Sequence, residues 1–597
     1  MFLAPVFMKD GDQNGEGKLS REEFAALGRK WFAVWDKSNA GRVTNDQLRS
    51  GLNVTFAPPP GFAPRGPGAP GFGHAPGVSM FQGRNGQRNG LASTMGIDFQ
   101  FVHADLEIQG QLVTDVAVRY KGNGTWVQSQ GSMKRSLKVH LKRFTKSQNL
   151  AGISEFNLHS CVTDAGFMNE VLSYRLFRDV GVPAGRTTYA RVYVTVPGQY
   201  ERKYLGLYSI VENVDAAFIH ERFKGKKGAI FKPVTPSLFS DLGDDWAKYR
   251  QAYDPKTDVS ESQARRVIEF AGLVTKADDA EFAAEAGEYL DLDEFSRFMA
   301  VTVWLSTLDS ILTTGQNYYL YLDPQTNKFQ FLPWDLDHSF GQFYVMGSQE
   351  QRENLSIHQP WQGNNRFLER VFKLEAFKKL YLARLQEFGT TIFKAERFHQ
   401  QVDEIAAAIR PAVEEESKEK LARFDKVVAG QAVPPAGFGG PANDPPAGGG
   451  GDVRFGGPSP FMMPSPKPIK GFVTARAQSV LDQLSGRKQG HVMAGFGFGP
   501  GGGPNPPGGP GAPGGPPAAF GPGMFLTPVF MAAHDTNKDG QLARDEFIES
   551  FVKWFDAWNS DKSGTLTDQQ LRAGIDKALM PPMPTGFGPP GAPAPRP

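Results

Sequence analysis

The chain has 597 residues, a formal net charge of +2 at pH 7, 68 glycines, 45 prolines and one cysteine. This length is enough for several domains, and the small net charge gives no electrostatic reason to expect nucleic acid or an anionic membrane as a partner. The single cysteine, Cys161, excludes an intrachain disulfide framework and a zinc site made of cysteines.

Glycine and proline are concentrated near residues 57–92, 433–469 and 488–523, and we expect no packed core in these stretches. No apolar run approaches the length that spans a membrane. The first residues, MFLAPVFMKDGD, lack a basic n-region and a full h-region, so no signal peptide is visible.

The two ends of the chain are copies of one repeat. Residues 2–50 align with residues 525–573 without a gap, at a constant offset of 523 positions. Each copy has a loop with the EF-hand pattern, in which spaced oxygen ligands and a glycine turn surround Ca²⁺, and the alternative is a merely polar turn. The predicted ligands are Asp12, Asn14, Glu16, the Lys18 carbonyl and Glu23 in the first copy, and Asp535, Asn537, Asp539, the Gln541 carbonyl and Glu546 in the last.

A second loop follows an apolar helix in each copy, beginning at Asp36 and at Asn559. Both second loops have a glutamine, Gln47 or Gln570, where the EF-hand has its bidentate glutamate. We therefore expect these loops to be structural partners with weak Ca²⁺ binding or none. Because the two ends are so alike, we also expect them to dock onto each other.

Residues 96–145 alternate apolar and polar side chains, which predicts β-hairpins. The motif KGNGTW places glycines between two strands, where backbone NH groups can lie over phosphates, although a plain hairpin turn fits equally well. In MKRSLKVHLKRF, Lys134 and Lys138 share the face opposite to the apolar residues. A lysine on such a strand can grip phosphates if it faces a cleft, and the alternative is a solvated basic face.

Residues 163–181 follow with helical apolar spacing and Asp164 as an N-cap. Glu170 on this helix can pair with a strand lysine, although we favour the interpretation that it is an ordinary surface glutamate. The strand GLYSIVE then ends at Glu212, and residues 245–310 and 362–425 are largely helical by their apolar spacing.

Residues 300–341 contain the acids around which the middle of the chain is organised. An apolar helical run precedes Asp309, Asn317 follows a polar loop, and a predicted hairpin leads to Asp335 and Asp337. A protein kinase uses the same order for the Asp that takes the acceptor hydroxyl's proton and for the Asn and Asp that hold Mg²⁺. The alternatives are a turn cap at Asp335 and Asp337, or a pair of carboxylates, Asp309 and Asp335, in a carbohydrate-processing site.

Several motifs, in the order in which they occur, resemble the CotH spore-coat kinase family over roughly residues 96–486: RYKGNGTW, KRSLKVHL, FNLHSCVTDAGFMNEVLSYRLFRDVGVP, YLGLYSIVENVD, NYYLYLD and FLPWDLDHSFG. The resemblance implies an atypical protein kinase that uses ATP and Mg²⁺ or Mn²⁺ to phosphorylate Ser or Thr of secreted or coat proteins. It makes Asp309 the catalytic base, and Asn317 and Asp335 metal ligands, with Asp337 beside them.

The resemblance further implies that Lys134 or Lys138 neutralises the phosphates and that Glu212 marks the hinge that meets the adenine of ATP. The loop from Asp309 to Asn317 is longer than the family's usual spacing. A Ca²⁺-binding scaffold with a degenerate, non-catalytic centre therefore stays as the alternative function.

The predicted fold class is α+β, with a two-lobed, atypical kinase-like central domain of mixed or antiparallel sheet and helices, and an all-α EF-hand pair at each end. We expect a protein substrate, the cofactors ATP, Mg²⁺ (or Mn²⁺) and Ca²⁺, and a secreted, periplasmic or cell-surface location, because polar EF-hand loops suit calcium-rich surroundings. The predicted segments are an EF-hand pair at 1–56, a linker at 57–95, the kinase-like domain at 96–486 with an insertion at about 430–469, a linker at 487–523, an EF-hand pair at 524–580 and a Pro-rich tail at 581–597.

Overall fold

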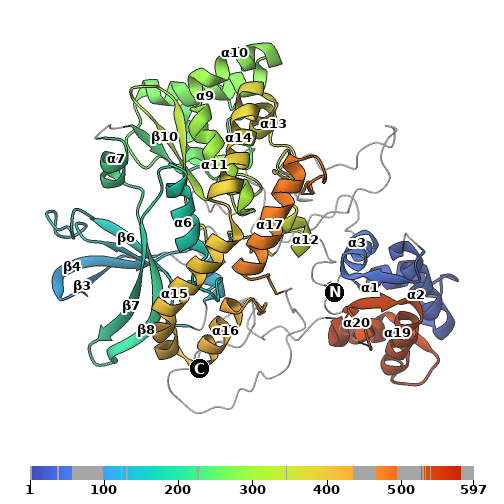
Figure 1. The fold of residues 1–597 in the computed structure, drawn as a ribbon. Coiled ribbons are helices and arrows are strands. Elements are labelled where there is room, and N and C mark those ends of the chain that lie inside the picture. Colours follow the sequence, from blue (N-terminus) through green and yellow to red (C-terminus); the bar gives the residue numbers. More distant parts are fainter. Residues whose placement is uncertain are drawn as a thin grey trace, which may run out of the picture. The chain divides into compact units, whose positions relative to one another are not determined.

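The computed structural model describes residues 3–56, 99–434, 465–493 and 526–579, except for positions 37–38, 123, 130–131, 225–227, 345, 528–529, 532 and 538. Most of the predicted linkers, insertion and tail lie outside the described residues. The contacts divide the chain into two units. The central unit contains the described residues 99–434 and 465–493, and the terminal unit contains those of both chain ends, 3–56 and 526–579 (Figure 1).

The central unit contains a six-stranded sheet in which every neighbouring pair of strands is antiparallel, in the order β3-β4-β5-β6-β8-β7. A two-residue turn at Gln109 and Gly110, both with positive φ, joins β3 to β4, as tight hairpins require. The sheet therefore follows the alternating pattern predicted from the sequence. Its strands are β3 (Val102–Ile108), β4 (Gln111–Tyr120), β5 (Leu137–His140), β6 (Glu155–His159), β7 (Thr187–Val196) and β8 (Tyr200–Glu212).

Helices and a second, three-stranded sheet of order β11-β10-β9 make up the rest of the central unit. The helix α11 is buried along most of its length and packs on α14. The remaining elements are α5 (Gly124–Gln128), α6 (Asn169–Asp179), α7 (Ala216–Arg222), β9 (Ala229–Phe231), α8 (Trp246–Tyr253), α9 (Glu261–Lys276), α10 (Asp279–Tyr289), α11 (Leu292–Trp304), β10 (Tyr318–Leu322), β11 (Phe329–Pro333), α12 (Gln349–Glu353), α13 (Arg366–Lys373), α14 (Glu375–Thr391), α15 (Ala395–Glu416), α16 (Lys418–Val428) and α17 (Ile469–Leu484).

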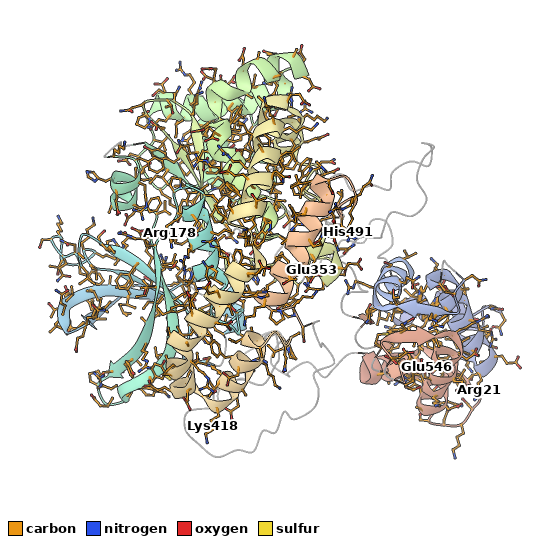
Figure 2. All side chains as sticks on the ribbon, viewed as in Figure 1. Arg21, Arg178, Glu353, Lys418, His491 and Glu546 are labelled. Atoms are coloured by element: carbon orange, nitrogen blue, oxygen red, sulfur yellow. The ribbon has the colours of Figure 1, made fainter. Side chains whose placement is uncertain are left out.

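The helix α17 returns to this fold after residues 435–464. Its Arg476 is fully buried and donates hydrogen bonds to the backbone carbonyls of Val303 and Leu355, at 2.9 and 2.7 Å. Burial lowers the pKa of Arg476 to about 10, so the side chain stays cationic near neutral pH. After α17, His491 forms a β-bridge with Leu355, beside Glu353 of α12 (Figure 2). The helix therefore completes the core of the central unit.

The central unit is an α+β fold with an antiparallel sheet, as predicted. A kinase-like, two-lobed arrangement stays a prediction. Among the described residues, none of the helices combines the length and the apolar character needed to cross a lipid bilayer.

The terminal unit is built from both ends of the chain, because their strands pair with each other. In it, β1 pairs with β13 and β12 pairs with β2, both antiparallel. The prediction that the two ends dock onto each other is thus confirmed. The elements are α1 (Ala4–Gly11), β1 (Lys18–Ser20), α2 (Arg21–Trp35), β2 (Arg42–Thr44) and α3 (Asn45–Thr55) from the first end, and β12 (Gln541–Ala543), α19 (Arg544–Trp558), β13 (Thr565–Thr567) and α20 (Asp568–Leu579) from the last.

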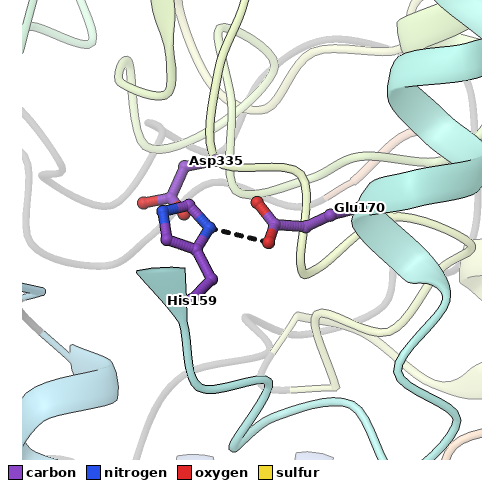
Figure 3. A group of neighbouring side chains, drawn as sticks. All are labelled: His159, Glu170 and Asp335. Carbon is purple, nitrogen blue, oxygen red and sulfur yellow. Dashed lines mark hydrogen bonds and ion pairs between the residues drawn. The ribbon is translucent and has the colours of Figure 1, made fainter. Parts of the chain in front are cut away.

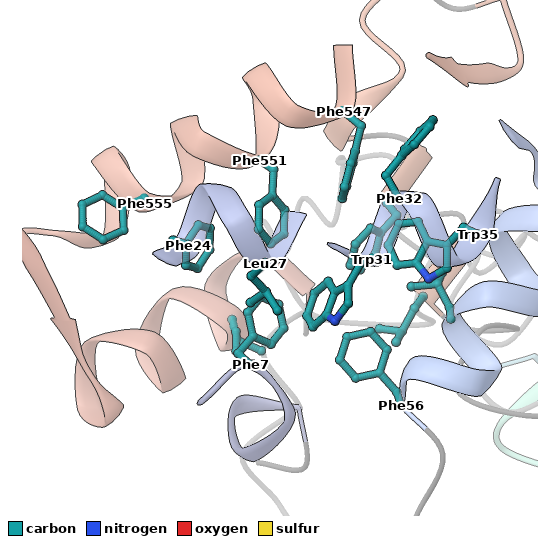
Figure 4. Close-up of a cluster of buried hydrophobic side chains, with 14 of the residues drawn as sticks. Phe7, Phe24, Leu27, Trp31, Phe32, Trp35, Phe56, Phe547, Phe551 and Phe555 are labelled. Atoms are coloured by element: carbon teal, nitrogen blue, oxygen red, sulfur yellow. The ribbon is translucent and has the colours of Figure 1, made fainter. Parts of the chain in front are cut away.

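The length of α2 explains why each end needs the other. The helix has 15 residues and is therefore about 22 Å long. Because β1 lies just before this helix and β2 lies after it, the two strands of one end are held apart and cannot pair with each other. An aromatic core joins the ends, with the ring of Phe24 stacked on that of Phe551 at 4.5 Å (Figure 4).

Candidate active site

Two strands of the central sheet end at the same place, and each presents a basic side chain there. Lys121 follows β4, and its amide donates a 2.9 Å hydrogen bond to the carbonyl of Ser136, which continues the sheet for one more residue. His159 is the last residue of β6 and is buried. The amino nitrogen of Lys121 lies 2.5 Å from Nε2 of His159.

A carboxylate from α6 holds the other side of the same ring. Nδ1 of His159 lies 2.7 Å from Oε2 of Glu170, which also accepts a 3.1 Å hydrogen bond from the Ser209 hydroxyl (Figure 3). The other oxygen of Glu170, Oε1, is buried and has no hydrogen-bond partner among the described residues. The interpretation of Glu170 as a surface glutamate is therefore wrong, because its side chain is buried against the sheet.

Asp335 reaches this group from the segment that follows β11. Its backbone has a φ of +54°, a left-handed conformation that aspartate tolerates better than most residues, and its amide donates to the hydroxyl of Tyr174 at 3.1 Å. One ligand atom each from His159, Glu170 and Asp335 lies within 4.8 Å of the others (Figure 3). Three elements distant in sequence thus bring an imidazole and two carboxylates together.

The charges around Asp335 favour its ionised form. Burial raises the pKa of this carboxyl group, but the nearby Lys121, His159, Lys232 and His338 outweigh burial, and the pKa is lowered overall. Burial lowers the pKa of Lys121, and the negative charge of Asp335 opposes that change. The site therefore pairs a partly buried carboxylate, Asp335, with several basic groups.

Asp337, two residues later, behaves differently. Burial and the negative charges of Asp335 and Glu170 raise the pKa of Asp337 to about 7. Its Oδ2 accepts a 2.8 Å hydrogen bond from the Thr163 hydroxyl. Its backbone carbonyl accepts another, at 2.7 Å, from the amide side chain of Asn169 at the start of α6. The turn that carries both acids is therefore fixed to the loop before α6.

These side chains line one pocket. The space that they enclose is about 450 Å³ when the part open to solvent is included. Lys121, His159, Glu170, Asp335 and Asp337 all lie on its wall, together with residues of the segments 122–125 and 160–167. The pocket thus has basic groups from the six-stranded sheet, and carboxylates from α6 and from the segment that follows β11.

The predicted residues Asp309 and Asn317 lie close to each other. The Asn317 side chain donates to the backbone carbonyl of Asp309 at 2.9 Å, so the long loop between them closes on itself. The Asp309 carboxylate accepts hydrogen bonds from Thr314 at 2.8 Å and from Gln316 at 3.1 Å. The carbonyl of Asn317 accepts a 3.1 Å bond from the amide of Trp334, which places Asn317 next to the segment that carries Asp335.

The two predicted strand lysines have carboxylate partners of their own. Lys134 precedes β5, is buried, and places its amino group 2.9 Å from each carboxylate oxygen of Glu416 at the end of α15. Lys138, on β5, pairs with Glu155 at 2.6 Å. The charges that act most strongly on Asp335 include neither of these lysines.

Glu212, the predicted hinge residue, ends β8 and binds arginines. Its carboxylate accepts hydrogen bonds from Arg186 at 2.8 Å and from Arg222 at 2.9 Å. The side chain is mostly buried between these two cations. It therefore joins β8 to the segments on either side of it in sequence.

Sequence reasoning missed Lys121 and His159 as site residues. Lys121 is the first residue of the KGNGTW motif, in which only the glycines were predicted to lie near phosphates. His159 is the last residue of an apolar strand. Their meeting depends on β5 lying between β4 and β6 and on the closeness of α6, which no local pattern encodes.

In the first terminal loop, side chains of the predicted ligands accept hydrogen bonds from backbone amides of the same loop. Asp12 accepts hydrogen bonds from the amides of Gly15 and Gly17, both at 2.8 Å, and Gly17 has a φ of +75°. Glu23 reaches back to the amide of Gln13 at 3.2 Å and thus closes the loop. Asn14 accepts from the amide of Glu16, and Lys18 begins β1.

The last copy repeats this arrangement at Asp535, Asn537, Asp539, Gln541 and Glu546. In this loop, the carboxylate of Asp535 accepts from Gly540, Asn537 accepts from Asp539, and Asp539 accepts from Gln541, which begins β12. Glu546 accepts from the amides at 536 and 537, at 2.6 and 2.9 Å. The buried Oδ1 of Asp535 has no hydrogen-bond partner within the part of the chain that the structure describes.

The pocket's donor set suits a divalent cation such as Mg²⁺. Such ions prefer carboxylate oxygens, and the site offers the carboxylate of Asp335 and the unpartnered Oε1 of Glu170, with Asp337 on the same pocket wall. Both ring nitrogens of His159 already contact protein groups, so the carboxylates are the better ligands. The residues present therefore fit a metal ion.

A family profile described as "CotH kinase protein" matches residues 118–429, which is more than half of the chain. The chain is also similar to the inner spore coat protein H of Bacillus subtilis (strain 168), with 26% identity over 290 residues, covering 47% of this chain and 76% of the relative. All pocket residues lie inside the range that the family profile matches, whereas both ends of the chain lie outside it.

Proposed function

Because the chain belongs to the CotH kinase protein family, we propose that its central unit is an atypical protein kinase. In this proposal it transfers the terminal phosphoryl group of ATP to a Ser or Thr hydroxyl of a protein, with Mg²⁺ or Mn²⁺. Phosphoryl transfer needs little covalent chemistry from the protein and depends on positioning and charge neutralisation.

One observation carries the proposal: an ionised, partly buried Asp335 meets Lys121 and a second carboxylate, Glu170, in a single pocket. Kinases use such a combination, in which a lysine grips the phosphates, a helix glutamate positions that lysine, and an aspartate holds the metal. Here the imidazole of His159 stands between the lysine and the glutamate.

The roles follow from these contacts. Asp335, with Glu170 Oε1 and Asp337, would hold the metal ion, which supplies positive charge to the β- and γ-phosphates when bound. Asn317 stays a candidate ligand because it lies next to the Asp335 segment. We assign phosphate binding to Lys121 because the amino groups of Lys134 and Lys138 are bound by other carboxylates.

Asp309 is the proposed base that orients the acceptor hydroxyl. Hydrogen bonds from Thr314 and Gln316 hold its carboxylate in place, and the side chain is only partly buried, so a substrate can reach it. Its negative charge also acts on His338, which follows Asp337. Asp309 therefore lies near enough to the segment of Asp337 and His338 for its charge to act there.

The test uses ATP labelled in its γ-phosphate, with Mg²⁺ or Mn²⁺. It measures how much label is incorporated into the chain itself or into a Ser-rich peptide. Asp335→Asn should lower the rate by at least about 10²-fold, because it removes a charge that contacts the reacting phosphates through the metal. Asp482→Asn is the matched control, since Asp482 is on α17 and binds the exposed Arg487. Equal labelling by Asp335→Asn and the unaltered chain would reject this mechanism.

We further propose that the first loop of each end binds Ca²⁺. The ligands would be Asp12, Asn14, Glu16, Lys18 and Glu23 in one loop, and Asp535, Asn537, Asp539, Gln541 and Glu546 in the other. The buried, unpartnered oxygen of Asp535 and the glycine turns with positive φ support this proposal.

The setting is proposed by analogy with the relative, whose name places it in the inner spore coat. We propose that this chain also works outside the cytoplasm, on proteins of a secreted or assembled surface layer. If the Asp335→Asn test fails while Ca²⁺ binding holds, a Ca²⁺-binding scaffold with a non-catalytic centre becomes the better description.

A further inference from the structure

The terminal unit has an internal two-fold relationship. The offset of 523 positions that relates the two ends in sequence also relates their strand pairs: Lys18 faces Thr567, and the equivalent pair is Gln541 facing Thr44. The glycine of each end that packs against a tryptophan, Gly51 or Gly574, repeats by the same offset. The two ends are thus equivalent halves joined face to face.

The halves differ where they meet. Gly28 on α2 and Phe551 on α19 occupy equivalent positions, and they contact each other: a Cβ atom added to Gly28 would lie 2.8 Å from Cδ1 of Phe551. Phe551 is fully buried and stacks on Phe24 (Figure 4). The last end therefore carries a protruding ring, and the first end carries the space that receives it.

This size difference selects pairing between unlike ends. Two copies of the first end would place glycine against glycine and leave a hole, which well-packed cores avoid. Two copies of the last end would place two phenylalanine rings in the same space. Only an end with Gly28 and an end with Phe551 fill the interface.

Each half is also incomplete by itself. The strands of one end are held apart by α2 or α19, and they need the strands of the other end as partners. Without that partner, buried rings such as those of Phe7, Trp31 and Phe547 would lose part of their cover. Residues 57–98 and 494–525 connect the halves to the central unit in the sequence. The corresponding half of a second copy has the same pairing surface as the half within the chain.

We propose that the unlike ends form a connector that joins copies of this chain, with Phe551 of one copy seated at Gly28 of the next. Pairing within one chain dominates in dilute solution, because a tethered partner acts at an effective concentration on the order of mM. At higher local concentration the same contacts link chains head to tail, and such an unlike-end interface generates rings or open rows. The central unit of each copy is then carried along the row.

The experiment uses full-length chains and light-scattering mass. Gly28→Phe gives a chain with a ring at both ends, and Phe551→Gly gives a chain with a space at both ends. An equimolar mixture of these two variants should form a 1:1 complex with twice the mass of one chain. Gly28→Phe alone should not form complexes, and the double variant, Gly28→Phe with Phe551→Gly, should behave as the natural chain because ring and space have exchanged ends.

A second arm tests the natural chain. After unfolding and refolding at concentrations from micromolar to millimolar, it should give multimers whose fraction rises with concentration, as should the double variant, whereas Gly28→Phe should give none. The proposal is overturned if the variant mixture shows no 1:1 complex. It is equally overturned if the natural chain stays a single copy over the whole range. Linkage between chains would then occur only when the ends carry the substitutions.

Discussion

The amino nitrogen of Lys121 lies 2.5 Å from Nε2 of His159. Because an ammonium group can only donate, Nε2 is the accepting nitrogen, and the opposite Nδ1–H donates to Glu170 at 2.7 Å. The imidazole thus connects Glu170 of α6 to Lys121, so the position of the helix determines the position of the lysine amino group. In this account, the helix sets where the lysine meets the phosphates.

Replacing Lys121 tests the assignment of the phosphate-binding lysine. Lys121→Ala should lower phosphoryl transfer by about 10²- to 10³-fold, because a positive charge facing the phosphates is lost in a partly buried site. Lys138→Ala, whose side chain pairs with Glu155, should change the rate by less than tenfold. The measurement is the initial rate with γ-labelled ATP, and the opposite ranking of the two variants would return the role to Lys138.

Glu170 is expected to be a positioning residue. Glu170→Gln should lower transfer by up to about 10²-fold through misplacement of Lys121, and it should weaken metal binding because a carboxylate oxygen is lost. Glu155→Gln is the matched control, since this glutamate pairs with Lys138 instead. Rates measured over a series of Mg²⁺ concentrations separate the two effects, and identical Mg²⁺ dependence in Glu170→Gln and the natural chain would remove Glu170 from the metal site.

Calcium binding at the terminal loops predicts two sites. Glu23→Gln and Glu546→Gln should each remove one site, because each loses one oxygen of the bidentate ligand. The neighbouring exposed acids supply the controls, Glu22→Gln and Asp545→Asn, which should keep both sites. Calorimetric titration gives the stoichiometry, and two sites remaining in the Glu23→Gln, Glu546→Gln double variant would contradict the assignment.

His534 predicts how acid acts on the terminal unit. Burial lowers the pKa of His534 to about 3, whereas the unfolded chain has the ordinary value near 6.5. Between these values the unfolded state binds more protons, so the free energy of unfolding falls as pH falls, by up to about 1.4 kcal/mol per pH unit. The loss should begin below pH 6.5.

The variant His534→Gln cannot gain a proton and should lack this part of the pH dependence. Scanning calorimetry between pH 7.5 and 5 measures the unfolding of the terminal unit in both proteins. If the two proteins lose stability in parallel over this range, His534 is not the group responsible.

The sequence predicted the parts of the fold that depend on local patterns. The hairpin of β3 and β4 has the alternation and the Gln109–Gly110 turn that define it. The constant offset between the two ends predicted their docking. The pairing of β1 with β13, by contrast, follows from the length of α2, which keeps the strands of one end apart.

The candidate site was predicted in part: Asp335 and Asp337 lie in one segment, whereas Glu170 and the basic groups come from other elements. Lys134 fits the alternation of a strand, yet it precedes β5 and binds Glu416, 282 residues away in sequence. Glu170 is buried against His159 of β6 and Ser209 of β8. These strands are neighbours in the sheet although β7 lies between them in the sequence. Such non-local neighbours leave no trace in the spacing of residues.

The most direct test of the central claim asks which phosphorus atom of ATP is transferred. The natural chain is incubated with Mg²⁺ and with ATP labelled either in the γ-phosphate or in the α-phosphate, and label on Ser or Thr is then quantified by mass spectrometry and counting. This account predicts label from γ-labelled ATP only, abolished by Asp335→Asn and kept in Asp482→Asn. Label from α-labelled ATP, or none from either nucleotide, would contradict it.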